Sequence, residues 1–144
     1  ANFTPEDQTF EIGKAIQLQE GTDVTIVATG HLVWEALQAA ETLNEQGITA
    51  DVINIHTIKP LDEAAILNSV AKTNCIVTAE EHNILGGLGE SVARVLAKNN
   101  PTPQEFIATQ DTFGESGTPP QLMKKYGLNA SAIVNASQRV LKRK

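Results

Sequence analysis

The sequence is poor in residues that would mark a secreted, membrane-spanning or disulfide-stabilised protein. It has one cysteine, Cys75, so an internal disulfide cannot form. No run of 18 or more apolar residues occurs, and a helix needs about that length to span a bilayer. No apolar signal segment stands at the start of the sequence either. We therefore expect a soluble cytoplasmic protein with no membrane partner.

Positive charge is also scarce. The 11 Lys and Arg residues are outnumbered by 17 Asp and Glu, which gives a formal net charge of −6. The only basic cluster is Lys142, Arg143 and Lys144 at the end of the sequence. Proteins that bind nucleic acids present a basic face or stripe to the phosphates. We therefore expect no nucleic-acid partner.

Aromatic residues make up only 4% of the chain, so the hydrophobic 41% comes mainly from Ala, Val, Ile and Leu. A chain of 144 residues fits one domain with one core. We interpret the polar residues 1–9 as a linker or N-terminal extension, and residues 10–144 as the domain. Cys75 begins the apolar run CIVTAE, which favours a buried side chain over a nucleophile.

Apolar, β-branched runs alternate with segments of helical period. Such runs, bounded by turn residues, predict strands over 23–30, 49–57, 75–80 and 104–110. Helices are expected over 31–47, 63–72, 87–99, 119–127 and from 129 to near the C-terminus. Alternation of this kind is typical of parallel βαβ units with helices on both faces of the sheet. The predicted fold is a three-layer α/β/α sandwich.

Capping residues support the boundaries of these helices. Asp62, which follows Pro60, is placed to cap the second helix. Thr118 can cap a later helix with Pro119 at its first position, and Gly127 is expected to end that helix. Asn129 would then begin a separate final helix.

The glycine-rich turn in AEEHNILGGLGESVARVL (79–96) is a candidate binding site. It fails the dinucleotide pattern because Val92 stands where a third glycine is needed, and it lacks the lysine of a phosphate loop. Free backbone amides at Gly87, Leu88, Gly89 and Glu90 could still bind a small anion at the start of a helix. The alternative is a tight turn that lets the helix lie close to the sheet.

The polar residues before this turn do not form an obvious acid–base pair. Glu80 and Glu81 are adjacent, and side chains on an extended strand alternate in direction. Capping of the turn is the favoured role, while His82 could instead act as a general base or, with Glu81, as part of a metal site. His31 and His56 also follow predicted strands, so His31, His56, Glu81 and His82 could meet at one edge of the sheet.

The first long helix has a clear apolar stripe. With Ala36 at its centre, the buried stripe contains Leu32, Ala39, Ala40 and Leu43. Trp34 falls on the opposite, polar face. An exposed tryptophan is either a simple surface residue or a contact for another domain or chain, and His31 would extend such an interface.

Four phrases of the sequence resemble the C-terminal domain of transketolase. They are GTDVTIVATG, ADVINIHTIKPLD, VTAEEHNILGGLGESVARVLA and DTFGESGTPPQLMKKYGLNASAIV, in this order and spacing. The resemblance covers about residues 10 to 142. It implies a mixed five-stranded sheet whose first strand, around residues 13–21, is antiparallel, whereas the periodicity by itself indicated only four parallel strands.

The resemblance also implies a three-domain thiamine diphosphate enzyme that transfers two-carbon ketol units between sugar phosphates. In that family the diphosphate and its Mg²⁺ are bound in the first domain on a Gly-Asp-Gly motif, which this sequence lacks. The second domain supplies the carboxylate that activates the cofactor. The chain is therefore expected to hold no catalytic, cofactor-binding or metal-binding residues, and to pack against the N-terminal and middle domains of a homodimeric enzyme.

Two classes of function remain open. The chain is either a structural and assembly domain of a transketolase-type enzyme, inactive alone, or a free-standing module that binds a small anion. Within the first class, deoxyxylulose phosphate synthase and the beta subunits of 2-oxo-acid dehydrogenases have similar domains. The first class is favoured because ketol transfer needs an electron sink that side chains cannot supply.

Overall fold

Five strands form one sheet in the order β1-β3-β2-β4-β5. The computed structural model describes residues 13–81, 87–109 and 119–144. The extension predicted over residues 1–9 and the cap predicted at Thr118 lie outside these residues. The strands are β1 (Ile16–Gln19), β2 (Val24–Ala28), β3 (Ala50–Asn54), β4 (Ile76–Glu81) and β5 (Gln104–Thr109).

The sheet is mixed, as the family resemblance implies. β1 pairs with β3 in the antiparallel sense, whereas β2, β3, β4 and β5 pair in parallel. The four parallel strands were predicted from their apolar runs. β1 is short, and its residues alternate less clearly between buried and exposed, so periodicity alone did not reveal it.

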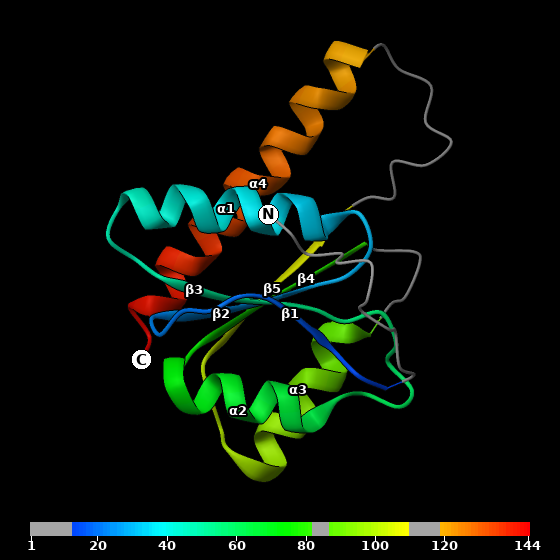
Figure 1. Cartoon of the computed structure of the whole chain (residues 1–144), viewed down its shortest axis with the longest axis vertical. Helices are drawn as coiled ribbons and strands as arrows, with labels where there is room; N and C mark the ends of the chain where they lie inside the picture. The colour runs from blue at the N-terminus through cyan, green and yellow to red at the C-terminus, as the bar shows by residue number, and fades with distance from the viewer. Residues whose placement is uncertain (1–12, 82–86, 110–118) are drawn as a thin grey trace.

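Helices cover both faces of the sheet, which confirms the predicted three layers (Figure 1). α1 and α4 lie on one face, and α2 and α3 lie on the other. Along each buried strand, alternate side chains enter the two cores. The helices are α1 (Leu32–Glu45), α2 (Glu63–Thr73), α3 (Leu88–Asn99) and α4 (Pro119–Leu141). None of them is long and apolar enough to cross a membrane, as far as the described residues go.

The predicted phase of α1 is confirmed. Its apolar stripe from Leu32 to Leu43 is buried, while Trp34 is 57% exposed. The predicted cap of α2 is also present, because the backbone N–H of Ala65 donates to Oδ1 of Asp62 at 3.1 Å. Cys75 is fully buried, as expected, and burial raises the pKa of its thiol.

The prediction of two C-terminal helices separated at Gly127 is wrong. The structure has one helix of 23 residues, α4. A glycine in a helix interior costs only about 1 kcal/mol relative to alanine, so it weakens a helix without necessarily ending it. The later part of α4 packs on α1 and β5, and such tertiary contacts readily outweigh a cost of that size.

A buried carboxylate organises the end of the sheet where the parallel strands begin. Asp51 is fully buried, and its Oδ1 accepts hydrogen bonds from Lys72 Nζ (2.9 Å), Gln17 Nε2 (3.1 Å) and the backbone N–H of Gly21 (3.0 Å). Its Oδ2 accepts from Ser69 Oγ. Asp51 therefore joins β1, β3 and α2, which is a structural role that we did not predict.

The C-terminal basic cluster is bound to its own chain at this same end. Lys144 Nζ donates to the carbonyl oxygens of Asp23 (2.8 Å) and Thr73 (2.9 Å). Arg143 Nη1 donates to Glu105 at 2.8 Å. These contacts hold the end of the chain against the starts of the parallel strands.

Candidate functional site

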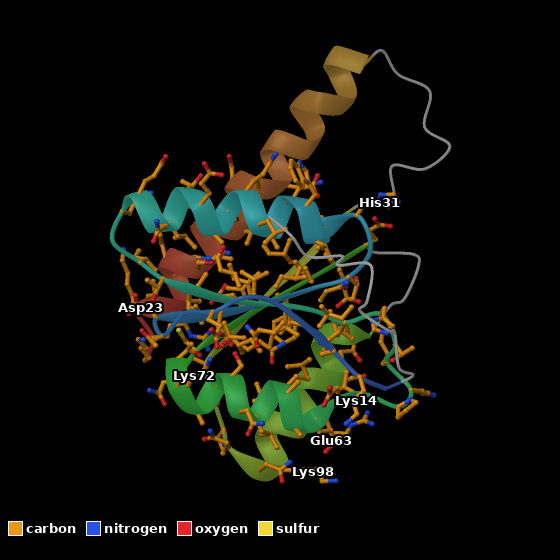
Figure 2. The ribbon with its side chains drawn as sticks, viewed as in Figure 1. Lys14, Asp23, His31, Glu63, Lys72 and Lys98 are labelled. Atoms are coloured by element: carbon orange, nitrogen blue, oxygen red, sulfur yellow. The ribbon has the colours of Figure 1, made fainter. Side chains whose placement is uncertain are left out.

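The carboxyl ends of the parallel strands form the edge at which α/β proteins commonly bind ligands. Asp23 precedes the first residue of β2, and His31 lies in the turn that follows the carboxyl end of this strand. In Figure 2 these two residues therefore mark the two ends of the parallel strands. The polar residues predicted from sequence follow β2, β3 and β4 and therefore lie at this carboxyl edge.

Glu80 caps helix α3. The backbone N–H groups of Gly87 and Leu88 donate to Glu80 Oε1 at 2.9 and 3.1 Å, and that of Gly89 donates to Oε2 at 2.8 Å. A carboxylate here satisfies amides that have no partner within the helix, and its charge complements the positive end of the helix dipole. Gly87 has φ 104°, a left-handed conformation that glycine adopts without strain.

Glu81 binds the start of α1, which lies on the face of the sheet opposite to α3. The backbone N–H of His31, at the start of α1, donates to Glu81 Oε1 at 3.2 Å. His31 Nε2 lies 4.0 Å from the same oxygen, so a protonated His31 would form an ion pair with it. The adjacent carboxylates thus point to opposite faces of the sheet, and they cannot act together on one reacting atom.

The predicted anion site coincides with the amides that Glu80 already uses. Leu88 and Gly89 are buried, and an external anion would have to displace the Glu80 carboxylate from them. Glu90 is exposed in the first turn of α3 and adds a second negative charge there. Anion binding at Gly87 to Glu90 stays a prediction. An anion would compete with the Glu80 carboxylate for these amides.

The structure brings together part of the predicted polar cluster. His31 and Glu81 are in contact. His56 follows β3 at the same edge and is half-buried, while His82 lies outside the described residues. A role for His56 and His82 in this cluster therefore stays a prediction.

A further carboxylate lies beside this cluster and was not predicted. Glu35, in the first turn of α1, is only 2% exposed. Burial is the main reason that the pKa of Glu35 is raised, and the negative charge of Glu81 raises it further. A hydrogen bond from the backbone of Glu35 itself and the charge of His31 act in the opposite direction. Its spacing was a usable signal, because Glu35 lies three residues after Leu32 and four before Ala39 on the edge of the buried stripe.

The described residues do not fit a site for a diphosphate and its magnesium ion. No group of three or more potential His, Cys, Asp or Glu ligands is found in residues 13–81, 87–109 and 119–144. The helix-terminal amides at Gly87 to Gly89, which could bind a phosphate, are taken by a carboxylate. The arrangement around Glu80 and Glu81 stabilises two helices, because their carboxylates accept from the amides that begin α3 and α1.

A groove lies between α1 and the end of β1. It has a volume of about 570 Å³ and contains the exposed ring of Trp34. Leu37 supplies further apolar surface, and Glu20 and Glu41 supply negative charge. An aromatic side chain beside a groove with a charged rim has the composition of an interface more than that of a small-molecule pocket.

Comparison with known protein families and curated relatives identifies the family of this chain. The family model for "Transketolase, C-terminal domain" matches residues 13–133. A 6-deoxy-6-sulfo-D-fructose transketolase subunit of Clostridium sp. strain MSTE9 is 50% identical over 139 residues, which make up 96% of this chain and 43% of that relative. A 1-deoxy-D-xylulose-5-phosphate synthase of Geobacter sulfurreducens is 42% identical over 132 residues, or 90% of this chain and 21% of that relative.

A solved structure resembles the whole chain. It is described as a split-gene transketolase, inactive beta4 tetramer, and it shares 43% sequence identity with a TM-score of 0.84. The match covers 99% of this chain and 46% of that one. The chain thus spans less than half the length of each of these relatives.

Proposed function

Because the chain belongs to the transketolase C-terminal domain family, we propose that it serves as the assembly domain of a thiamine diphosphate-dependent enzyme. The complete enzyme transfers two-carbon ketol units between sugar phosphates. The N-terminal and middle domains bind thiamine diphosphate and Mg²⁺ and perform the chemistry. We further propose that this enzyme is a homodimer and acts in the cytoplasm.

The observation that carries this proposal is the 50% identity to a transketolase subunit of which the chain spans only 43%. The rest of such an enzyme must pack against this domain, either on the same polypeptide or on another. The deoxyxylulose phosphate synthase relative is less similar, at 42% identity. The local geometry agrees with a supporting role, because the amides of α3 are committed to Glu80.

The groove beside Trp34 is the surface that we propose for contact with the other domains, and we propose that His31, three residues before Trp34, extends this surface. Trp34 is large, 57% exposed and placed on the face of α1 that points away from the sheet. Tryptophan is prominent among the residues that dominate binding energy in interfaces. The occupant of this groove is a segment of the thiamine-binding domains that carries apolar and basic side chains, because Glu20 and Glu41 line the groove.

Reconstitution tests the proposed function. The 144-residue chain is mixed with the polypeptide that carries the remaining domains, in the presence of thiamine diphosphate, Mg²⁺, xylulose 5-phosphate and ribose 5-phosphate. We expect turnover from the mixture and none from either component alone. Other ketose donors are assayed in parallel, so that a different substrate preference is not read as inactivity.

Two results would overturn the proposal. Turnover by the isolated chain would show that it contains its own catalytic centre. Failure of the two polypeptides to associate at micromolar concentrations would show that this domain does not assemble the enzyme.

A further inference from the structure

The two edges of the sheet differ in how well they are protected from pairing with another strand. β1, at one edge, has four residues, and its register with β3 is irregular between Gln17 and Gln19. β5, at the other edge, has six residues and a regular register with β4. Native proteins usually protect an edge with a short strand, a bulge or exposed charges. The only charged residue of β5 is Glu105, and its carboxylate is already paired with Arg139 and Arg143.

The backbone groups of Phe106 and Ala108 point outward from this edge. Along a strand, successive residues direct their N–H and C=O groups alternately to the two sides. The N–H of Ile76 in β4 donates to the carbonyl oxygen of Pro103 at 3.1 Å, so the odd-numbered residues of β5 face β4. The even-numbered residues therefore face away from it. Among the residues that the structure describes, none bonds to the backbone of Phe106 or Ala108 on the outer side.

This stretch of free edge is short and apolar. Phe106 is 54% exposed, and Ala108 is exposed as well. The stretch is limited on one side by Gln104, whose carbonyl oxygen accepts from Arg143 Nη1 at 2.8 Å. Phe106 and Ala108 thus offer two N–H donors and two C=O acceptors, with an aromatic and a small side chain on one face of the sheet.

We infer that β5 pairs with β5 of a second copy of this chain, in the antiparallel sense, about a two-fold axis at Ile107. In this register Phe106 of each copy exchanges two hydrogen bonds with Ala108 of the other, so every free group of both residues is used. Each Phe106 ring also lies beside the small Ala108 side chain of the second copy. A register centred on Phe106 would instead pair Ala108 with Gln104, whose carbonyl oxygen is already bound.

The second copy fits this edge because the edge is complementary to itself. A contact about a two-fold axis uses the same surface patch on both subunits. The charge of Glu105 is neutralised within its own chain, so two copies can approach along β5 although each has a net charge of −6. The inference goes beyond the proposed function, since it concerns the contact of this domain with itself and not with the thiamine-binding domains.

Sedimentation of the 144-residue chain tests the inference. We expect a monomer–dimer equilibrium between micromolar concentrations and about 1 mM. Ala108→Lys should raise the dissociation constant at least about tenfold, because a lysine on an edge strand opposes pairing. Ala71→Lys is the matched control, since Ala71 is exposed on α2, and it should leave the equilibrium unchanged. Ala108→Pro should act like Ala108→Lys, because it removes an outward N–H that β4 does not use.

Cross-linking tests the register. Ile107 would face Ile107 of the second copy in a non-hydrogen-bonded pair, where the Cα atoms are about 4.5 Å apart and a disulfide can form. Under mild oxidation, Ile107→Cys should therefore give a covalent dimer. Ala71→Cys should not, although its thiol would be exposed. The native Cys75 is buried and does not compete.

Three results would overturn the inference. The first is a wild-type chain that stays monomeric at about 1 mM. The second is self-association that folded Ala108→Lys and Ala108→Pro leave unchanged, because another surface would then form the dimer. The third is a wild-type dimer without a cross-link in Ile107→Cys, which would exclude the register and decides the matter if both Ala108 variants are unfolded by circular dichroism. All three leave the proposed function intact, because reconstitution with the thiamine-binding domains tests that function separately.

Discussion

Glu80 and Glu81 are consecutive residues at the end of β4, and they bind helices on opposite faces of the sheet. Glu80 accepts from the amides that begin α3, and Glu81 accepts from the amide of His31 at the start of α1. The alternation of side chains along a strand makes this division unavoidable. The pair thus joins the two helical layers at the edge where related folds bind ligands.

The first prediction concerns the Glu80 cap. Glu80→Gln should lower the free energy of unfolding by roughly 1–3 kcal/mol, because the amide NH₂ replaces an acceptor that faces backbone N–H groups. Glu90→Gln is the control, since Glu90 is an exposed carboxylate in the first turn of the same helix. Removing the charge of Glu90 should lower the free energy of unfolding by about 0.3–1 kcal/mol at most. Urea denaturation measures both, and equal costs would contradict the assigned role of Glu80.

The same site gives a prediction about anions. Glu80→Ala would leave the amides of Gly87, Leu88 and Gly89 without their acceptor. Sulfate should then raise the unfolding temperature of this variant more than that of the wild type, because the freed amides at a helix N-terminus bind anions. Equal effects of sulfate on both proteins, with sodium chloride at matched ionic strength as reference, would exclude an anion site here.

Lys72 and Lys98 offer a matched pair for the buried Asp51. Both lie in the last turn of a helix, α2 and α3 respectively, and Figure 2 shows both. Of these two lysines, only Lys72 donates to Asp51, at 2.9 Å. Lys72→Ala should cost about 1–2 kcal/mol of stability, because it removes a charged donor from a buried carboxylate while its own exposure moderates the effect. Lys98→Ala should cost less than about 1 kcal/mol. Equal unfolding midpoints would mean that the ion pair contributes nothing.

Acid should destabilise the protein partly through Asp23. A hydrogen bond from the backbone N–H of Thr49 (2.7 Å) is the main reason that the pKa of Asp23 lies below its usual range, and burial opposes this only in part. A lowered pKa in the folded state contributes stability above the unfolded pKa of about 3.9, and this stability is lost as the pH falls through the folded value.

Asp23→Asn should therefore show a smaller loss of stability than the wild type between about pH 5 and pH 3. Thr49→Val should give an intermediate slope, since it removes the side-chain hydrogen bond at 3.0 Å and keeps the backbone one. Thermal unfolding across this pH range measures all three proteins. An unchanged slope in Asp23→Asn would show that other carboxyl groups control acid unfolding.

The last prediction concerns Trp34. In the dilute free chain its emission should be red and readily quenched by acrylamide, and it should shift to the blue when the thiamine-binding domains are added. Trp34→Ala should weaken assembly by about 2 kcal/mol or more if the side chain is an interface anchor. Phe106→Ala is the control, because Phe106 is similarly exposed, at 54%, but lies on the edge strand β5. Equal effects of the two substitutions would argue against the groove on α1.

Much of this domain was determined by local features of its sequence. The four parallel strands follow from apolar runs, the phase of α1 follows from the stripe around Ala36, and the start of α2 follows from Asp62. These features depend on neighbours within one or two turns or along one strand, so a pattern in the sequence suffices. The family resemblance added β1, which is too short for its pattern to be read.

The tertiary structure decided what depends on partners distant in the sequence. The burial of Asp51 requires Lys72 and Ser69 from another element, and the burial of Glu35 requires the end of β4 beside α1. The continuity of α4 through Gly127 likewise reflects packing that outweighs a local preference for a break. Periodicity reports which face of an element is apolar, but not which charged group another element will bring to it. Only the assembled sheet and helices place such groups together, because their energies come from desolvation and pairing across the fold.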